Sequence, residues 1–165
     1  MPILKATLDT NVFPAQTLIE RARLARVDAT AISVSTREVE GSSLEAELTA
    51  LEKVLEGAVF DESRFDEAVF GKEDDDLNLE KALALISSGA FPPKGERENL
   101  TPGQRRQLRD AMILCAHVRA CRDILVSNDH RAFINAGRRE ALESAFATRI
   151  MTVAEFEEFI ESAHR

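Results

Sequence analysis

The chain has 165 residues, of which 44% are hydrophobic, and this length and composition fit one globular domain with a sizeable buried core. Its formal net charge of −8 argues against the class of nucleic-acid binders that rely on a strongly basic domain. No apolar run approaches the roughly 20 residues that a membrane-spanning helix needs, and no signal peptide precedes the first strand-like segment. We therefore expect a cytoplasmic protein without membrane contact.

Two short runs in the first part of the chain predict strands. Residues 3–8 (ILKATL) form an apolar run that ends in Asp9, and residues typical of turns and helix caps follow it. Residues 31–36 (AISVST) form a second, β-branched run, and a charged segment with Glu38 and Glu40 follows directly. Each run predicts a strand that leads into a helix, with an acidic residue near the transition.

The middle of the chain is expected to be mainly helical. Leucines recur every three or four residues from 44 to 55, which predicts a helix that Gly57 ends. Residues 58–100 contain two further helical patterns joined by the acidic segment 71–76 (GKEDDD), which we expect to be a loop. Because this stretch has too few apolar residues for its own core, we interpret it as a helical insertion in a single domain covering 1–165.

The last part of the chain has clear helix boundaries. Thr101 and Gln104 form the pattern of a capping box with proline at the first helical position, which predicts a helix running to about Cys121. Asp110 lies near the edge of the apolar stripe of that helix, so its carboxylate is expected to face the sheet rather than bulk water. The remaining predicted elements are a strand at 124–126, a helix around 141–146, a strand at 149–151 and a final helix capped by Thr152 and Glu155.

Acidic residues lie near the end of each of the first three predicted strands. Strands that alternate with helices predict a parallel sheet with helices on both faces, and ligands of such sheets gather at the carboxyl ends of the strands. Asp9 and Asp129 follow the first and third strands. Glu38 or Glu40 follows the second, and Asp110 lies on the helix that leads into the third. These carboxylates are therefore expected to meet at one edge of the sheet.

Such a group of carboxylates predicts a bound metal. Carboxylates brought close together raise one another's pKa unless a cation neutralises them. Ligands that are all oxygen favour Mg²⁺ or Mn²⁺ over zinc, and such metals commonly support hydrolysis of phosphodiester bonds. Structural interpretations also exist, since Asp9 alone fits an N-cap of the following helix and Asp129 alone fits a turn.

Three segments of the chain resemble the PIN-domain ribonucleases, a family that includes the toxins of bacterial toxin–antitoxin pairs. They are LDTN at 8–11, ISVSTREVE at 32–40 and RDAMILCAHVRACRDILVSND at 109–129. The resemblance implies a three-layer α/β/α sandwich with a central parallel sheet, and the activity of a metal-dependent endoribonuclease. The insertion at 58–100 is longer than the compact toxins usually carry.

The same resemblance assigns roles to the acidic residues. It implies that Asp9, Asp110 and Asp129 are catalytic residues that bind Mg²⁺ or Mn²⁺. Glu38 would orient the attacking water or bind a second metal. Glu38 is preferred to Glu40 because an apolar residue follows it, as in the family, although a one-step helical shift would reverse this choice.

Further residues are assigned to supporting roles. Asn11 and Ser127 occupy positions that usually support the metal or its water in this family. Arg37, Arg109 and Arg131 lie nearest to the acids in sequence and are expected to contact the RNA backbone, which gives affinity without sequence preference. The expected partners are an RNA substrate and, if the chain is a toxin, an antitoxin protein; a homodimer is compatible with either role.

Two other functions fit parts of this pattern. A chain that keeps the PIN fold without catalysis would be a protein-interaction module, with its helical insertion docking a partner. A phosphatase-like enzyme with Asp9 as nucleophile is disfavoured, because the residue two positions later is Asn11 rather than a second acid.

Overall fold

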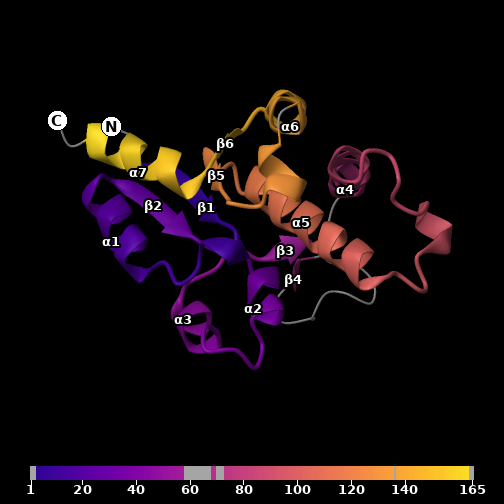
Figure 1. Ribbon diagram of the computed structural model, residues 1–165, viewed down its shortest axis with the longest axis horizontal. Coiled ribbons are helices and arrows are strands. Elements are labelled where there is room, and N and C mark those ends of the chain that lie inside the picture. The colour runs from indigo at the N-terminus through magenta and orange to yellow at the C-terminus, as the bar shows by residue number, and fades with distance from the viewer. Residues whose placement is uncertain (1–2, 58–67, 70–72, 136, 164–165) are drawn as a thin grey trace.

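The computed structural model describes residues 3–57, 68–69, 73–135 and 137–163. Within these residues, four parallel strands form a central sheet in the order β2-β1-β5-β6 (Figure 1). The chain is thus of the mixed α/β class with a parallel sheet, as the sequence predicts. The strands of this sheet are β1 (Leu4–Leu8), β2 (Val27–Thr30), β5 (Ile124–Val126) and β6 (Arg149–Met151).

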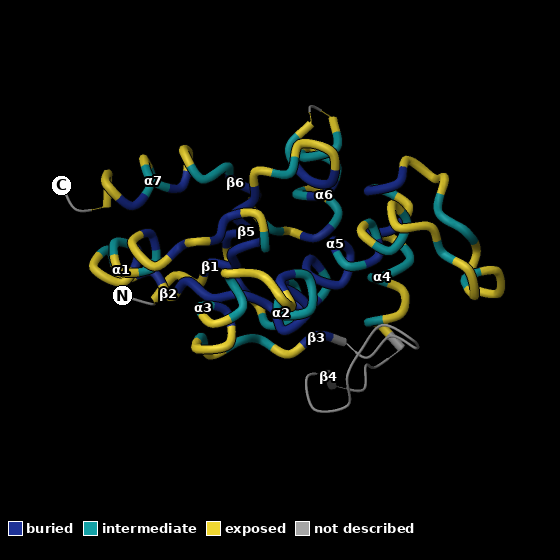
Figure 2. The backbone as a smooth tube through the Cα atoms, turned by 60° about the horizontal axis from the view of Figure 1, so that its bottom comes forward, coloured by how far each residue is buried: buried dark blue, intermediate teal, exposed yellow. Residues whose placement is uncertain are grey.

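The inner strand β5 is the most deeply buried strand of the sheet. β5 lies between β1 and β6, and all three of its residues are buried, as expected for a strand covered on both faces. In β1, Ala6 and Leu8 face one side of the sheet, whereas Thr7 faces the other and lies opposite Leu125 of β5. Figure 2 shows the buried residues gathered along these strands and along the neighbouring helix α5.

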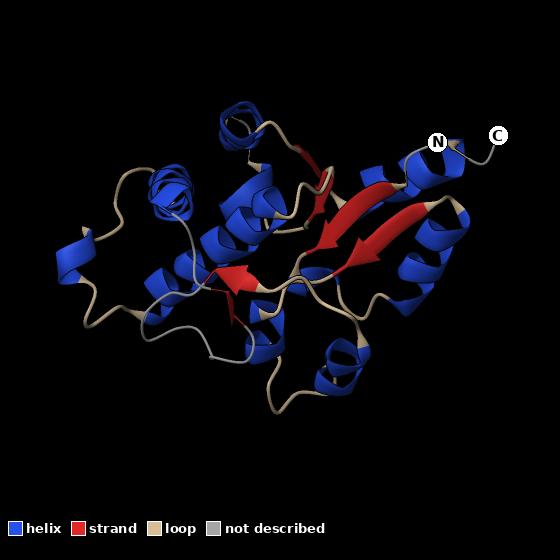
Figure 3. Ribbon diagram, turned by 180° about the vertical axis from the view of Figure 1, so that it is seen from behind, coloured by secondary structure: helices blue, strands red, loops and turns tan. Residues whose placement is uncertain are grey.

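Helices cover both faces of the sheet, so the elements form α, β and α layers. The helices α1 and α7 pack in a core cluster with Ala6, Leu8 and Val126. The helices α4, α5 and α6 pack in a second cluster with Leu125 and Ile150, which face the opposite side (Figure 3). The bounds are α1 (Gln16–Leu24), α4 (Glu73–Ile86), α5 (Pro102–Arg119), α6 (Arg138–Phe146) and α7 (Val153–Ser162).

Shorter elements connect these layers. They are η1 (Thr10–Val12), α2 (Val34–Glu38), α3 (Glu45–Ala50), η2 (Lys94–Glu96), the π-helical turn η3 (His130–Ile134), and the strands β3 (Glu56–Gly57) and β4 (Ala68–Val69). The strands β3 and β4 pair in parallel outside the main sheet. None of the described helices combines the length and the apolar character that a bilayer crossing requires.

The predicted helix from Thr101 is confirmed, including its start. The backbone N–H of Thr101 donates to the side chain of Gln104 (2.8 Å), and the N–H of Gln104 donates to the Thr101 hydroxyl (3.2 Å). The helix ends at Arg119, close to the predicted end. The capping box of Thr152 and Glu155 also forms at the start of α7, and the predicted strands β5 and β6 are confirmed.

The predicted strand at 31–36 is wrong. β1 pairs with β2 from Leu4 opposite Val27 to Thr7 opposite Thr30, so its partner strand comes from residues before this run. Ile32 and Val34, with no exposed surface, pack into the second core cluster, and the chain turns there into α2. Their β-branched side chains serve core packing, which overrides strand propensity here.

The predicted helix at 44–55 is wrong in its second half. α3 ends at Ala50, and Leu55 is 41% exposed rather than part of an apolar face. The Lys53 ammonium donates hydrogen bonds to the backbone oxygens of Leu48 (2.9 Å) and Leu51 (3.0 Å). The Lys53 ammonium thus supplies donors to carbonyl groups in the last turn of α3 and just after it, which stabilises the early stop.

The predicted loop in the acidic segment of the insertion is also wrong. Residues 73–76 form the first turn of α4 rather than a loop, and carboxylates are favourable there because they lie near the positive end of the helix dipole. Ala82, Leu83 and Ile86 of α4 join the second core cluster with α5. The helix expected around residues 60–70 falls on positions almost all outside the described residues.

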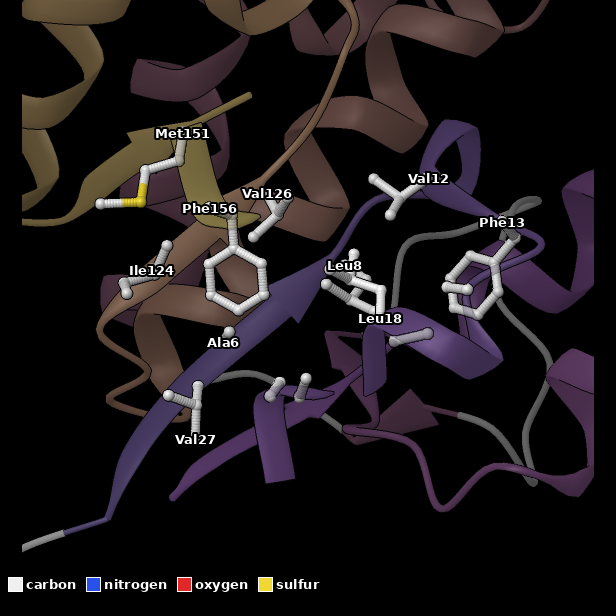
Figure 4. Close-up of a cluster of buried hydrophobic side chains, with 14 of the residues drawn as sticks. Ala6, Leu8, Val12, Phe13, Leu18, Val27, Ile124, Val126, Met151 and Phe156 are labelled. Carbon is white, nitrogen blue, oxygen red and sulfur yellow. The ribbon is translucent and has the colours of Figure 1, made fainter. Parts of the chain in front are cut away.

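Phe156 of α7 anchors the first core cluster. Its ring has no exposed surface and lies over the sheet beside Ala6 and Val126 (Figure 4). Phe159 lies on the same helix but is only partly buried, at the margin of the cluster. The two phenylalanines therefore differ in burial while sharing one helix.

Replacing Phe156 with alanine is expected to lower the free energy of unfolding by about 3–5 kcal/mol, because the change removes a fully buried ring and leaves a cavity. Phe159→Ala is the matched control and is expected to cost less than half as much. Urea denaturation followed by circular dichroism measures both changes. Equal losses in the two variants would contradict this account of the core.

His117 is a buried titratable residue between α5 and the sheet. It has no exposed surface, and its ring nitrogens lie 2.8 Å from the Thr7 hydroxyl and 2.6 Å from the Thr148 hydroxyl. Burial lowers the pKa of His117 from 6.5 to about 4; nearby Arg122 lowers it further, and Asp123 opposes the shift. The folded chain therefore keeps this imidazole neutral in mildly acidic solution.

Acid is expected to destabilise the fold through His117. Between pH 6.5 and 4 the unfolded chain binds a proton at this residue and the folded chain does not, so the contribution of His117 to stability falls as the pH falls. The loss is on the order of 3 kcal/mol. His117→Gln removes the titrating group, so the unfolding free energy of the variant relative to wild type is expected to rise as the pH is lowered through this window. Urea titrations at several pH values measure this difference. If it did not change with pH, the lowered pKa of His117 would be contradicted.

Candidate active site

The sheet has a topological switch point between β1 and β5. The chain passes from β1 to β2 on one side and later adds β5 on the other side, so a crevice opens at the carboxyl ends of β1 and β5. Asp9 directly follows β1, and Ser127 directly follows β5. Ligands of open parallel sheets bind at such a point.

Asp9 connects the ends of the two strands. It is 3% exposed, and one of its carboxylate oxygens accepts the backbone N–H of Thr10 (2.7 Å). The other oxygen accepts hydrogen bonds from the Ser127 hydroxyl (2.6 Å) and the Asn11 amide (2.7 Å). Asp9 therefore caps η1, as its structural interpretation predicts, while its second oxygen ties β1 to the residues after β5.

Asn11 and Ser127, the two residues assigned to supporting roles, extend this network beyond Asp9. The side-chain oxygen of Asn11 accepts the backbone N–H of Asn128 (2.9 Å), and the Ser127 hydroxyl accepts the N–H of Asp129 (2.9 Å). Asn128 is a participant that the sequence analysis did not identify. Because these bonds cross between the two strand ends, they fix Asp9 and Asp129 relative to each other.

Asp129 and Asp110 reach the same site from different elements. Asp129 caps η3 by accepting the N–H of Ala132 (2.8 Å) with one oxygen. Asp110 of α5 is 6% exposed, and its carboxylate accepts no hydrogen bond from the described residues. Because Asp110 is almost fully buried and borders a cavity, its charged form is unfavourable unless a cation or a donor in the cavity accompanies it.

Glu38 is the acid that α2 contributes. Its carboxylate accepts a hydrogen bond from the Thr10 hydroxyl, which links α2 to the turn after β1. Glu40 is exposed, beyond the end of the helix. The structure thus places Glu38 rather than Glu40 among the other acids, and Thr10 is a second participant that the sequence analysis missed.

The four acids line one cavity of about 390 Å³, which we call the acidic cavity. Its lining residues are Asp9, Thr10, Asn11, Glu38, Pro102, Arg106, Arg109, Asp110 and Asp129. The expectation that the acids meet at one edge of the sheet is therefore met for each of the four.

Burial and mutual repulsion shift the protonation of the acidic cavity. Burial, with help from Glu38 and Asp129, raises the pKa of Asp9 to about 7. Burial and the neighbouring carboxylates, Asp9 first among them, raise the pKa of Asp110 to about 9. Burial also raises the pKa of Glu38, although the hydrogen bond from Thr10 and the nearby Arg109 oppose this. Charge in the cavity is therefore unfavourable unless a cation shares it.

The donor set of this cavity suits a hard divalent metal. Within the described residues, no group of three or more His, Cys, Asp or Glu side chains is arranged closely enough to hold an ion as it stands. The four candidate ligands offer only oxygen atoms, which Mg²⁺ and Mn²⁺ prefer. The buried Asp110 carboxylate, which lacks a hydrogen-bond donor and borders the cavity, is the observation that fits a cation.

The three arginines expected to contact a substrate lie in different environments. Arg109 lines the acidic cavity, and Arg131 lines a neighbouring one. Arg37 lies in neither cavity; its guanidinium pairs with Glu56 at 2.6 Å, with side-chain exposures of 8% and 0%. Arg106 lines both cavities and was missed, although its place one helical turn before Asp110 puts both on one face of α5.

Comparisons of the chain with protein-family models, with curated proteins and with solved structures find no match in any of the three.

Asp110→Asn is expected to raise the melting temperature at pH 8 in the presence of EDTA. The raised pKa of Asp110 means that the folded chain keeps a proton that the unfolded chain releases above pH 3.8, so the contribution of Asp110 to wild-type stability falls as the pH rises. The amide lacks this penalty, and each kcal/mol regained corresponds to about 2–4 °C. The gain should shrink at pH 5. Scanning fluorimetry would contradict this if the variant melted below wild type at pH 8.

Proposed function

We propose that this chain is a metal-dependent nuclease with a PIN-like α/β/α sandwich that hydrolyses RNA phosphodiester bonds. The observation that carries the proposal is the acidic cavity, where four carboxylates from four separate elements meet at the switch point of a parallel sheet. Two arginines, Arg106 and Arg109, line the same cavity and supply positive charge for a phosphate.

In this proposal Asp9, Asp110 and Asp129 hold Mg²⁺ or Mn²⁺. When bound, the metal supplies an activated water and neutralises charge on the phosphate. Ser127 and Asn11 hold the Asp9 carboxylate in one orientation, so that its position does not depend on the substrate. Glu38 is held by Thr10 at the cavity wall, where it orients the attacking water and accepts its proton.

The arginines on α5 position the substrate in this proposal. Both Arg106 and Arg109 lower the pKa of Glu38, which shows that their charges reach the carboxylates. A guanidinium group binds phosphate oxygens through two parallel hydrogen bonds, which orients the phosphate as well as attracting it. α5 thus carries both a metal ligand and phosphate contacts on one face.

Cleavage of a fluorescent single-stranded RNA with millimolar Mn²⁺ tests the proposal. Wild type is expected to cleave and EDTA to stop it, while Asp110→Asn and Glu38→Gln lose roughly 100-fold or more in kcat/KM. Glu40→Gln is the matched control, because Glu40 is exposed and two residues away. Mn²⁺ should also raise the melting temperature of wild type but not of Asp110→Asn.

Absence of cleavage together with absence of any thermal shift by Mn²⁺ would overturn the proposal. That pair of results would instead favour an interaction module that keeps the fold without catalysis. Equal losses in Glu38→Gln and Glu40→Gln would overturn the role assigned to Glu38.

A further inference from the structure

A second cavity of about 340 Å³ adjoins the acidic cavity. The two share Arg106, Asp110 and Asp129, so they open into each other beside the metal ligands. We call the second one the arginine cavity, because Arg131 and Arg138 join Arg106 along it.

A third cavity, of about 440 Å³, continues the same path. It shares Asn135 and Arg138 with the arginine cavity and reaches Ser88 just after α4. The path thus leads away from Asp110, past η3 and the start of α6, to the end of α4.

The three arginines of this path are not held in ion pairs by the described residues, although the charge of Arg106 acts on the nearby carboxylates of Glu38 and Asp110. Within the described residues, Arg106, Arg131 and Arg138 form no ion pair with a carboxylate, and the acids that line the arginine cavity are Asp110 and Asp129 at its catalytic end. By contrast, several other arginines pair with acids, including Arg21, Arg97, Arg122 and Arg139.

Arg138 is held in place by neutral groups. Its guanidinium donates to the Ser88 hydroxyl (2.7 Å) and to the backbone oxygen of Arg131. Neither acceptor carries a charge, so the side chain is oriented without being neutralised. Arg139, the next residue, points its guanidinium instead to Glu155 at 3.0 Å. The two neighbours differ in whether their charge is free for a ligand.

The chemistry of the path suits the phosphates of a single strand. Guanidinium groups bind phosphate bidentately, and Gln107, Asn135 and Ser87 add uncharged hydrogen-bonding groups to the lining. No aromatic residue is among the described lining residues, so base stacking does not contribute. The cavities are lined by residues of α4, α5, η3 and α6, so the arginines lie along a recessed path, which suits a flexible single strand better than the convex surface of a duplex.

We propose that Arg106, Arg131 and Arg138 form an arginine track that binds the sugar-phosphate backbone of single-stranded RNA on one side of the scissile phosphate. This proposal rests on the nuclease function proposed above. It adds that the substrate must extend several nucleotides past the cleaved bond in the direction of α6, and that affinity depends on backbone charge rather than on base identity.

The binding test uses the Asp110→Asn chain in EDTA, which cannot cleave, with fluorescence anisotropy of a labelled RNA octanucleotide at about 0.1 M salt. Adding Arg138→Gln is expected to raise the Kd about tenfold and to reduce the salt slope by about 0.7, the value for one lost phosphate contact on a single strand. Arg131→Gln, an exposed residue, should act in the same way and guards against misfolding of the Arg138 variant. Arg139→Gln is the matched control and should leave the Kd within about twofold of its parent.

The cleavage test uses the wild-type background with Mn²⁺ and compares substrates of two lengths. Arg138→Gln is expected to lower kcat/KM about tenfold for the octanucleotide, and this loss should exceed the loss for a dinucleotide that cannot reach Arg138. Equal losses for the two lengths would overturn the track.

The remaining outcomes separate the track from the nuclease activity. Equal Kd values for Arg138→Gln and Arg139→Gln would overturn the track even if wild type cleaves RNA. If wild type binds RNA through these arginines but shows neither cleavage nor a thermal shift with Mn²⁺, the nuclease proposal is overturned and the track stands as an RNA-binding surface. Equally tight, arginine-dependent binding of a duplex of the same sequence would overturn the preference for single strands.

Discussion

The hydrogen bond from the Ser127 hydroxyl to the Asp9 carboxylate joins two strand ends that are 118 residues apart in the chain. β1 and β5 are paired through their backbones as far as the bond between the Asp9 N–H and the Val126 oxygen. Beyond that point the side chains hold the two ends together. The positions of Asp9 and Asp129, and so the walls of the acidic cavity, depend on this contact.

The carboxylates of the acidic cavity destabilise the fold when they are charged, because they are buried and repel one another. Asp110 is buried on the helix that also carries much of the second core cluster, so apolar packing around Leu114 and Met112 keeps the carboxylate where it is. Arg106 and Arg109 lessen the repulsion from the cavity wall. Strongly perturbed carboxyl groups gathered in a cavity mark a candidate functional site, and here geometry and electrostatics agree.

Local signals explain which parts of this site could be predicted from the sequence. Asp110 lies within a capped helix and Asp129 follows a fully apolar strand, and the neighbouring residues specify the boundaries of both elements. Glu38 lines the acidic cavity although the strand predicted before it is wrong, because the helix that carries Glu38 begins nearby in either case. The strand order that brings Asp9 beside Ser127 depends on pairing between distant segments, which no local pattern encodes. Arg37 illustrates the same limit, since its partner Glu56 lies in a weakly patterned stretch.

The buried pair of Arg37 and Glu56 sets a boundary for shortening the chain. Glu56 lies on β3, just before the insertion, and it also accepts the Ser33 hydroxyl (3.0 Å) at the start of α2. Trimming the insertion back past Glu56 would bury the Arg37 guanidinium without this carboxylate, a change that typically costs about 3–5 kcal/mol. Since Arg37 precedes Glu38 on the same helix, the loss would fall on the segment that carries a catalytic candidate. Glu56 therefore belongs to the folded domain, and any shortening of the chain after β3 must leave this glutamate in place.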